Sequence, residues 1–254
     1  MALTARRTAR HGWRPDLPDH RDQPFSPPDA DVRTAHVDLE STLPPAYDQS
    51  QLGSCVGNGV AAGVEHAQMV QREGETTPSR LFIYYGARQI EGTVSQDSGA
   101  QIRDGMKVVA KLGAPPESLW PYDIAKFAQQ PPAAAYAAAR QHVAVAYKRV
   151  AQTTQALKAA LAAGHPVVFG FTVYESFESA EVAQTGVLSM PAHGESVVGG
   201  HCVVLVGYDD FTQRFKVRNS WGESWGIRGH FTMPYGYVTS RSLASDFWVL
   251  TRES

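Results

Sequence analysis

The chain has 254 residues, of which 43% are hydrophobic and 19% are charged, and its formal net charge at pH 7 is −2. This composition is ordinary for a soluble globular protein, and a chain of this length buries a sizeable core without covalent cross-links. With only two cysteines, Cys55 and Cys202, it can form neither a disulfide framework nor a four-thiolate zinc site. The nearly balanced charge also argues against a dedicated nucleic-acid-binding protein.

The N-terminal segment does not have the pattern of an export signal. Three arginines among the first ten residues are followed by a polar, proline-rich stretch, whereas a secretory signal would continue with an apolar run. No apolar stretch in the sequence approaches the length that spans a bilayer. We therefore expect a cytoplasmic protein with no membrane partner, although export by a dedicated secretion machinery would leave no recognisable mark.

Residues 1–40 are predicted to form an extended arm that precedes a globular domain at 41–254. Regular helix is excluded there by Pro15, Pro18, Pro24, Pro27 and Pro28. Trp13 and Phe25 are among the few apolar side chains of this segment, and we expect them to anchor the arm. A disordered tail is the alternative, but such tails usually have fewer aromatic residues.

Helical patterns dominate the first half of the globular region. Residues 54–71 carry valines at helical spacing after Ser54, a suitable N-cap, and their three glycines predict a buried, closely packed helix. Further helices are predicted at 80–90, 100–112, 132–141 and 153–163, with Gly113 and Gly164 ending the 100–112 and 153–163 helices.

Strand patterns dominate the second half. They fall at 166–173, 202–208, 214–219, 229–233 and 246–251. A chain with helices first and strands second predicts an α+β fold of two packed lobes with a cleft between them.

Cys55 stands at the start of the first predicted helix. A helix N-terminus presents unpaired N–H groups and a partial positive charge, and both stabilise a thiolate, which is the nucleophilic form of cysteine. A free cysteine is nevertheless more often a small buried hydrophobic residue, so its position alone does not establish a catalytic role.

Three other side chains supply the remaining parts of an activated nucleophile. His201 begins a predicted strand, and Asn219 ends another, where its amide can accept a ring N–H from His201 and fix the tautomer. Trp221 can shield that hydrogen bond from water. Gln49 adds an amide donor that can form an oxyanion hole with the backbone N–H of Cys55.

These motifs together resemble those of the papain-like cysteine peptidases. The matching segments are Gln49…Gly53-Ser54-Cys55, then the stretch from Gly200-His201-Cys202 to Gly207-Tyr208, and then Asn219-Ser220-Trp221-Gly222-Glu223-Ser224-Trp225-Gly226. The last block is the most specific. The separation of Cys55 and His201 lies within the roughly 130–150 residues typical of the family, and the resemblance covers about residues 40–254.

The resemblance implies a fold, an activity and a set of catalytic roles. The fold is a helical N-terminal lobe and a β-barrel-like C-terminal lobe, with the active site in the cleft between them. Cys55 matches the nucleophile, His201 the general base and acid, Asn219 the orienting amide and Gln49 the oxyanion glutamine. The implied reaction is hydrolysis of a peptide bond by acyl transfer, and it needs no metal and no organic cofactor.

The resemblance also implies substrate-binding residues. Gly99 and Ala100 match the segment whose backbone pairs with a bound peptide. The main specificity pocket and the edge of the cleft correspond to Ile102, Gly170, Gly199, Gly200 and Trp221. The expected partner is a peptide or protein substrate, with no nucleic acid.

The sequence departs from the family pattern in a few places. Leu52 stands where a disulfide-forming cysteine is usual, and Val56 replaces the usual aromatic residue after the nucleophile. Cys202 replaces an alanine, and we expect it to fill space in the core in preference to acting as a resolving thiol for Cys55. These departures predict a disulfide-free version of the enzyme.

Two questions remain open from the sequence. The arm resembles the leader of bacterial papain-like peptidases, so it is either an intramolecular inhibitor that borders the cleft or a structural strap on the back of one lobe. The domain itself is expected to be a peptidase. The alternatives are a catalytically silent peptide-binding module and a transpeptidase or amidase on the same fold.

Overall fold

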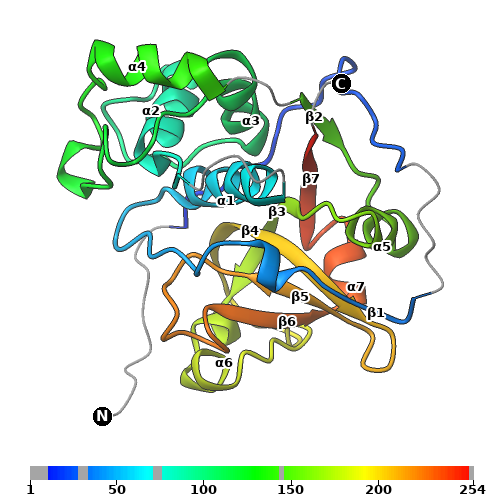
Figure 1. The fold of residues 1–254 in the computed structure, drawn as a ribbon. Helices are drawn as coiled ribbons and strands as arrows, with labels where there is room; N and C mark the ends of the chain where they lie inside the picture. Colours follow the sequence, from blue (N-terminus) through cyan, green and yellow to red (C-terminus); the bar gives the residue numbers. More distant parts are fainter. Residues whose placement is uncertain (1–10, 28–33, 71–75, 143–145, 252–254) are drawn as a thin grey trace.

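The computed structural model describes residues 11–27, 34–70, 76–142 and 146–251 (Figure 1). Two hydrophobic clusters form the core, one among the helices of the first half and one on the sheet of the second half. The fold is therefore the expected two-lobed α+β arrangement. Within the described residues, no helix combines the length and the apolar character that a membrane span requires.

The helical lobe is built around one buried helix, α1 (Cys55–Val70). The helices that accompany it are α2 (Arg80–Glu91), α3 (Ile102–Lys111) and α4 (Ala133–Ala139). A β-carbon on Gly57 would lie 2.6 Å from the Arg80 carbonyl oxygen, and one on Gly59 would lie 3.0 Å from Cys202 Sγ. The glycines that weaken this helix locally are thus required by close packing, as predicted.

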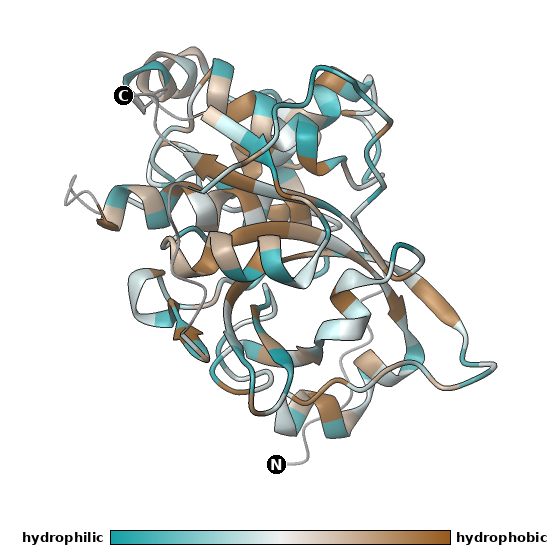
Figure 2. Cartoon of the chain, turned by 90° about the vertical axis from the view of Figure 1, so that its right-hand side faces the viewer, coloured by the Kyte–Doolittle hydropathy of each residue, from teal (hydrophilic) through white to brown (hydrophobic). Residues whose placement is uncertain are grey.

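The second lobe is an antiparallel sheet with strand order β2-β7-β3-β4-β5-β6, and β1 pairs with β4. The strands are β1 (His36–Asp38), β2 (Ala146–Arg149), β3 (Val167–Tyr174), β4 (Val197–Asp209), β5 (Arg214–Arg218), β6 (His230–Pro234) and β7 (Ala244–Thr251). Helices α5 (Thr154–Ala162), α6 (Ala180–Thr185) and α7 (Tyr235–Thr239) flank it. The most hydrophobic segments are the strands that cross the middle of the molecule (Figure 2).

The predicted helices and strands are all present, with shifted ends. The largest difference is β4, which begins at Val197, so His201 lies inside this strand and not at its edge. Gly199 and Gly200 lower the strand propensity of this segment and conceal its true start. The elements β1, β2, α6 and α7 were not predicted, because segments of three to six residues are too short to show a periodic pattern.

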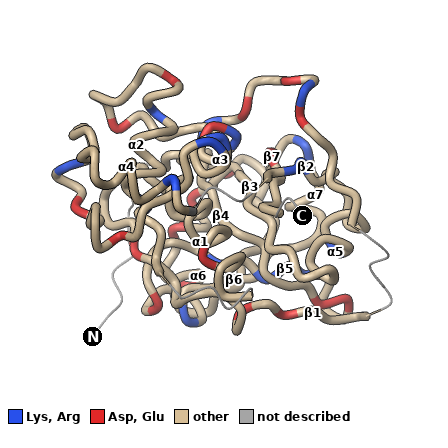
Figure 3. The backbone as a smooth tube through the Cα atoms, turned by 45° about the horizontal axis from the view of Figure 1, so that its top comes forward, with Lys and Arg blue, Asp and Glu red and all other residues tan. Residues whose placement is uncertain are grey.

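The arm is extended along the surface where the two lobes meet. Within its described residues 11–27 the backbone forms two isolated bridges to the domain, from Trp13 to Ala100 and from Pro24 to Arg149. Basic and acidic residues are interspersed along the chain (Figure 3). Between residues 14 and 22 the arm itself alternates acidic and basic side chains, and several of them pair with the domain, as described below.

Candidate active site

Cys55 is the first residue of α1 and is completely buried. The loop before it is held at two points. The Gln49 N–H donates to the Ser220 carbonyl oxygen at 2.8 Å, and the Gly53 N–H donates to the Asp97 carboxylate at 3.1 Å. The start of the helix is therefore fixed against both lobes, and the thiol faces the junction between them.

His201 and Asn219 meet across neighbouring strands. The Nε2 atom of His201 lies 2.8 Å from Asn219 Oδ1, which also accepts the Ser220 N–H at 2.8 Å. Since Oδ1 is an acceptor, Nε2 carries the hydrogen and Nδ1 keeps its lone pair. Nδ1 is buried and has no hydrogen-bond partner among the described residues, so it is the ring nitrogen left for proton exchange.

An aromatic cage surrounds this pair. The Trp221 ring lies 5.1 Å from the His201 ring, centroid to centroid, and the rings of Phe171 and Phe177 lie 5.9 and 6.2 Å from it. Because these rings exclude water, the hydrogen bond between His201 and Asn219 is stronger than it would be in solvent.

The side chain of Gln49 is buried and held in one orientation. Its Oε1 accepts a hydrogen bond from Ser220 Oγ at 2.6 Å, and its Nε2 donates to the Leu52 carbonyl oxygen at 2.9 Å. Nε2 carries two hydrogens, so one N–H remains beyond the bond to Leu52. The amide is thus presented as a donor beside the loop that leads to Cys55.

The arm passes directly over the Cys55 thiol. The Gly12 N–H lies close enough to this thiol to lower its pKa, and the Gly12 carbonyl oxygen accepts the Ala100 N–H at 2.8 Å. The Trp13 N–H donates to the Gly200 carbonyl oxygen at 3.0 Å, and the Arg14 N–H donates to the Ala100 carbonyl oxygen at 3.1 Å. The described part of the arm therefore crosses the cleft and does not lie on the back of one lobe.

Burial under the arm favours the neutral forms of both reactive groups. It raises the pKa of Cys55 to about 11, against the lowering effect of backbone N–H donors from Cys202, Gly12 and Val56. Burial, followed by the charge of nearby His11, lowers the pKa of His201 to about 3, against the raising effect of the Asn219 hydrogen bond. The thiolate expected from the helix N-terminus is therefore disfavoured while the arm is seated.

The indole of Trp13 fills a pocket between the lobes and is only 8% exposed. A β-carbon on Gly170 would lie 1.9 Å from this ring, and one on Gly200 would lie 2.7 Å from it. Ile102 is fully buried in the same hydrophobic cluster. Gly199 contacts the residue of the arm two positions earlier, since a β-carbon there would meet the His11 side chain at 2.6 Å.

Two residues that the sequence analysis did not single out connect the nucleophile loop to the peptide-binding edge. The Tyr84 hydroxyl donates to Asp97 Oδ1 at 2.6 Å and accepts the Gly99 N–H at 3.1 Å, while Asp97 accepts the Gly53 N–H. This link joins the loop before Cys55 to the segment at Gly99 through hydrogen bonds alone. Only the position of Asp97, two residues before Gly99, would have suggested it.

Buried charges also anchor the arm beyond the cleft. Asp22 accepts hydrogen bonds from Arg103 Nη2 at 2.7 Å and from Arg149 Nη1 at 2.9 Å. Arg149 Nη2 reaches Asp246 Oδ1 at 3.2 Å, and Asp246 Oδ2 accepts the Asp16 N–H at 2.8 Å. Three carboxyl groups thus face two guanidinium groups. Burial, followed by the charge of Asp246, raises the pKa of Asp16 to about 7.

Cys202 follows His201 in β4 and is buried against α1. Both cysteines are free thiols. Among the described residues, no group of three His, Cys, Asp or Glu side chains is arranged to hold a metal ion.

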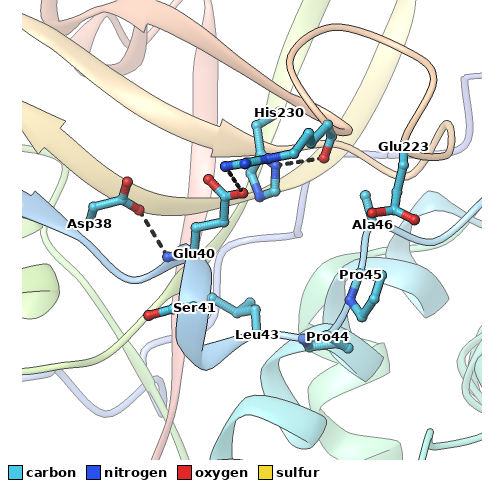
Figure 4. Close-up of a pocket in the computed structure, with 10 residues that line it drawn as sticks. Asp38, Glu40, Ser41, Leu43, Pro44, Pro45, Ala46, Glu223 and His230 are labelled. Carbon is cyan, nitrogen blue, oxygen red and sulfur yellow. Dashed lines mark hydrogen bonds and ion pairs between the residues drawn. The ribbon is translucent and has the colours of Figure 1, made fainter.

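A second pocket lies apart from the residues described above. Its volume is about 520 Å³, and acidic, aliphatic and basic side chains line it (Figure 4). The lining residues are Asp38, Glu40, Ser41, Leu43, Pro44, Pro45, Ala46, Glu223, Arg228 and His230. One of its acidic side chains, Glu40, forms ion pairs with both Lys216 and Arg228.

Comparison with known proteins identifies similar chains over nearly the whole sequence. The model of the papain family cysteine proteases matches residues 26–248. An uncharacterised peptidase C1-like protein of Acanthamoeba polyphaga mimivirus is 44% identical over 221 residues, which cover 82% of this chain and 71% of that protein.

Solved structures are similar as well. Xylellain, a cysteine protease from Xylella fastidiosa, has 39% sequence identity and a TM-score of 0.90, and the match covers 100% of both chains. Digestive procathepsin L 3 of the Tenebrio molitor larval midgut has a TM-score of 0.70 at 19% identity, over 88% of this chain and 72% of that one. The second likeness shows the fold alone.

Proposed function

The chain belongs to the papain family of cysteine proteases, and from that premise we propose that Cys55 and His201 carry out its peptide-bond hydrolysis. The observation that carries the proposal is the pairing of His201 Nε2 with Asn219 at 2.8 Å, which leaves Nδ1 for the thiol proton. Asn219 acts by holding the imidazole in this tautomer and orientation.

The reaction proceeds in two halves. His201 takes the thiol proton, and the Cys55 thiolate attacks the peptide carbonyl while the amide of Gln49 and the Cys55 N–H stabilise the oxyanion. The imidazolium then gives its proton to the leaving amine, and a thioester forms. In the second half His201 deprotonates a water molecule, which hydrolyses the thioester and restores the thiol.

Replacing Gln49 with alanine is expected to lower kcat about 10²- to 10³-fold, because the oxyanion loses one fixed donor that acts mainly in the transition state. KM should change much less. Steady-state kinetics on a fluorogenic peptide measure both constants, and the thermal midpoint serves as the folding control. A variant with unchanged kcat would remove Gln49 from the oxyanion hole.

We further propose that the arm restrains this activity. It occupies the backbone groups of Ala100 and Gly200, which the resemblance assigns to peptide binding, and it covers the Cys55 thiol. A substrate therefore competes with the arm for the same hydrogen bonds. Activity requires that the arm from residue 11 to residue 22 leaves its seat, which readmits water to the cleft and removes the burial that keeps thiol and imidazole neutral.

The hold of the arm is expected to weaken as pH rises. Because the pKa of Asp16 is raised in the seated arm, seating takes up a proton and is favoured at low pH. This stabilisation of the seated arm is lost as the pH rises from about 4, the ordinary pKa of an aspartate, to about 7, the pKa of Asp16 in the seated arm.

An Asp16→Asn variant imitates the protonated form at every pH. The ratio of wild-type to Asp16→Asn basal activity should therefore rise about 10-fold or more between pH 5 and pH 7 and then level off. The ratio cancels the titration of His11, Cys55 and His201, which is common to both proteins. A ratio that stays constant with pH would exclude Asp16 as the titrating group.

A further inference from the structure

We propose that Asp246 is a specificity-determining residue, which selects substrates that place a tryptophan side chain in the pocket now filled by Trp13. The inference rests on the proposed function, since it concerns the substrate of the same cleft.

The pocket fits a flat, broad side chain. The Trp13 ring lies so close to Gly170 and Gly200 that β-carbons on them would fall 1.9 and 2.7 Å from its atoms. The Trp13 N–H donates to Gly200, and its two neighbours, Gly12 and Arg14, hydrogen-bond Ala100 on the other side. The pocket therefore opens beside the peptide-binding edge, where a substrate side chain can enter it.

A carboxylate receives the polar end of the indole. Trp13 Nε1 donates to Asp246 Oδ2 at 3.2 Å, and Asp246 is only 3% exposed. The backbone of Asp246 has a φ of +61°, a left-handed conformation that aspartate adopts more readily than most residues other than glycine. This conformation occurs beside an irregularity in the pairing of β3 with β7, which lies between Val168 and Gly170.

The two oxygens of Asp246 have different partners. Oδ1 pairs with Arg149, which belongs to the domain, whereas Oδ2 accepts from Trp13 Nε1 and the Asp16 N–H, which both belong to the arm. When the arm leaves, Oδ2 loses these two donors. Arg149 also loses Asp22, so Asp246 becomes its remaining carboxylate partner in this cluster.

The vacated pocket therefore presents an acceptor inside an apolar site. A buried acceptor left without a donor disfavours binding, so a side chain that supplies an N–H from an apolar ring is selected over one that cannot. Arg149 already balances the charge of Asp246. A neutral donor is consequently sufficient, and a substrate arginine gains less because it approaches a second guanidinium group.

The first test measures kcat/KM of the full chain on matched fluorogenic peptides. Tryptophan is moved through each of the three residues before the fluorogenic amide, and at each position it is compared with phenylalanine, leucine and arginine. At one position we expect tryptophan to exceed phenylalanine by about 10- to 100-fold. The ratio is independent of how much enzyme has an open arm, because both peptides meet the same population.

The second test changes Asp246 and repeats the comparison. Asp246→Gly removes the carboxylate and tolerates the positive φ, so the ratio of tryptophan to phenylalanine should fall to about 1. Asp246→Asn also tolerates this φ and keeps one oxygen acceptor, so it should retain part of the preference. If one variant fails to fold, the ratio in the other tests the role of Asp246, and a wild-type ratio of about 1 overturns the inference by itself.

The outcomes separate this inference from the proposed function. Hydrolysis with phenylalanine or leucine equal to tryptophan at every position overturns the role of Asp246 and leaves the peptidase intact. A preference for arginine means that Asp246 selects a positively charged side chain, which also overturns the inference. If no peptide is cleaved, even by a chain whose arm has been displaced, the result contradicts the proposed peptidase function and therefore also the inferred substrate class.

Discussion

A Cys55→Ala variant is expected to lose peptide hydrolysis by at least about 10⁴-fold in kcat, the scale seen when a catalytic nucleophile is removed from a hydrolase. Alanine cannot form the thioester, and no other thiol reaches the same place, because Cys202 faces α1 at Gly59. The substitution removes one buried sulfur beneath the arm, so the fold should persist.

The matched control for this variant is Cys202→Ala. It removes the other buried thiol, and alanine is the residue that the family usually has there, so activity should stay within about threefold of wild type. Both variants should unfold in a single cooperative transition. Hydrolysis that survives in Cys55→Ala but not in Cys202→Ala would reverse the assignment of the nucleophile.

A Gly12→Ala variant is expected to raise the basal activity of the full chain by about 5- to 150-fold, since an overpacked contact typically costs about 1–3 kcal/mol. The added β-carbon would lie 1.7 Å from the Gly53 carbonyl oxygen, which is backbone and cannot move aside cheaply. The substitution lies in the arm, so every residue of the catalytic site is unchanged. Its effect therefore reports on the seating of the arm.

Leu17→Ala is the control within the arm. This side chain is 69% exposed, and the hydrogen bonds of Leu17 to Gln101 and Arg103 use only its backbone. Activity should equal that of the wild type, measured as initial rates on one peptide at several enzyme concentrations. If Gly12→Ala leaves the rate unchanged or lowers it, the arm does not restrain the enzyme.

The sequence was informative where the signal is local. The glycines of α1 are an example, because a helix retained despite Gly57 and Gly59 has to be closely packed, and both approach neighbouring atoms closely. The segments with a clear periodic pattern were also predicted correctly as helices or strands. Their ends shifted where glycines or short elements weaken the pattern, as at the start of β4.

The contacts that control the site are long-range and left no such signal. Asp246 is one of several acidic residues in the sequence, and its place beneath Trp13 depends on two segments more than 200 residues apart. The link from Tyr84 through Asp97 to Gly53 also spans separate segments. Composition and spacing do not encode these contacts, because they depend on the lobes and the arm packing together.

The charge state of the site could not be predicted from the motif either. A helix N-terminus favours a thiolate at Cys55, but complete burial under the arm outweighs that effect and raises its pKa to about 11. The same burial lowers the pKa of His201 to about 3. The residues therefore identify the chemistry, whereas the position of the arm decides whether the chemistry can begin.

The most direct measurement of this account is the alkylation rate of Cys55 by iodoacetamide at pH 7, followed by mass spectrometry of the intact protein and its peptides. In the wild type we expect slow modification of Cys55. In Gly12→Ala the rate should rise by about the same factor as peptide hydrolysis, and it should stay low in Leu17→Ala. Equal and rapid alkylation of Cys55 in all three proteins would contradict the claim that the arm closes a reactive thiol inside the cleft.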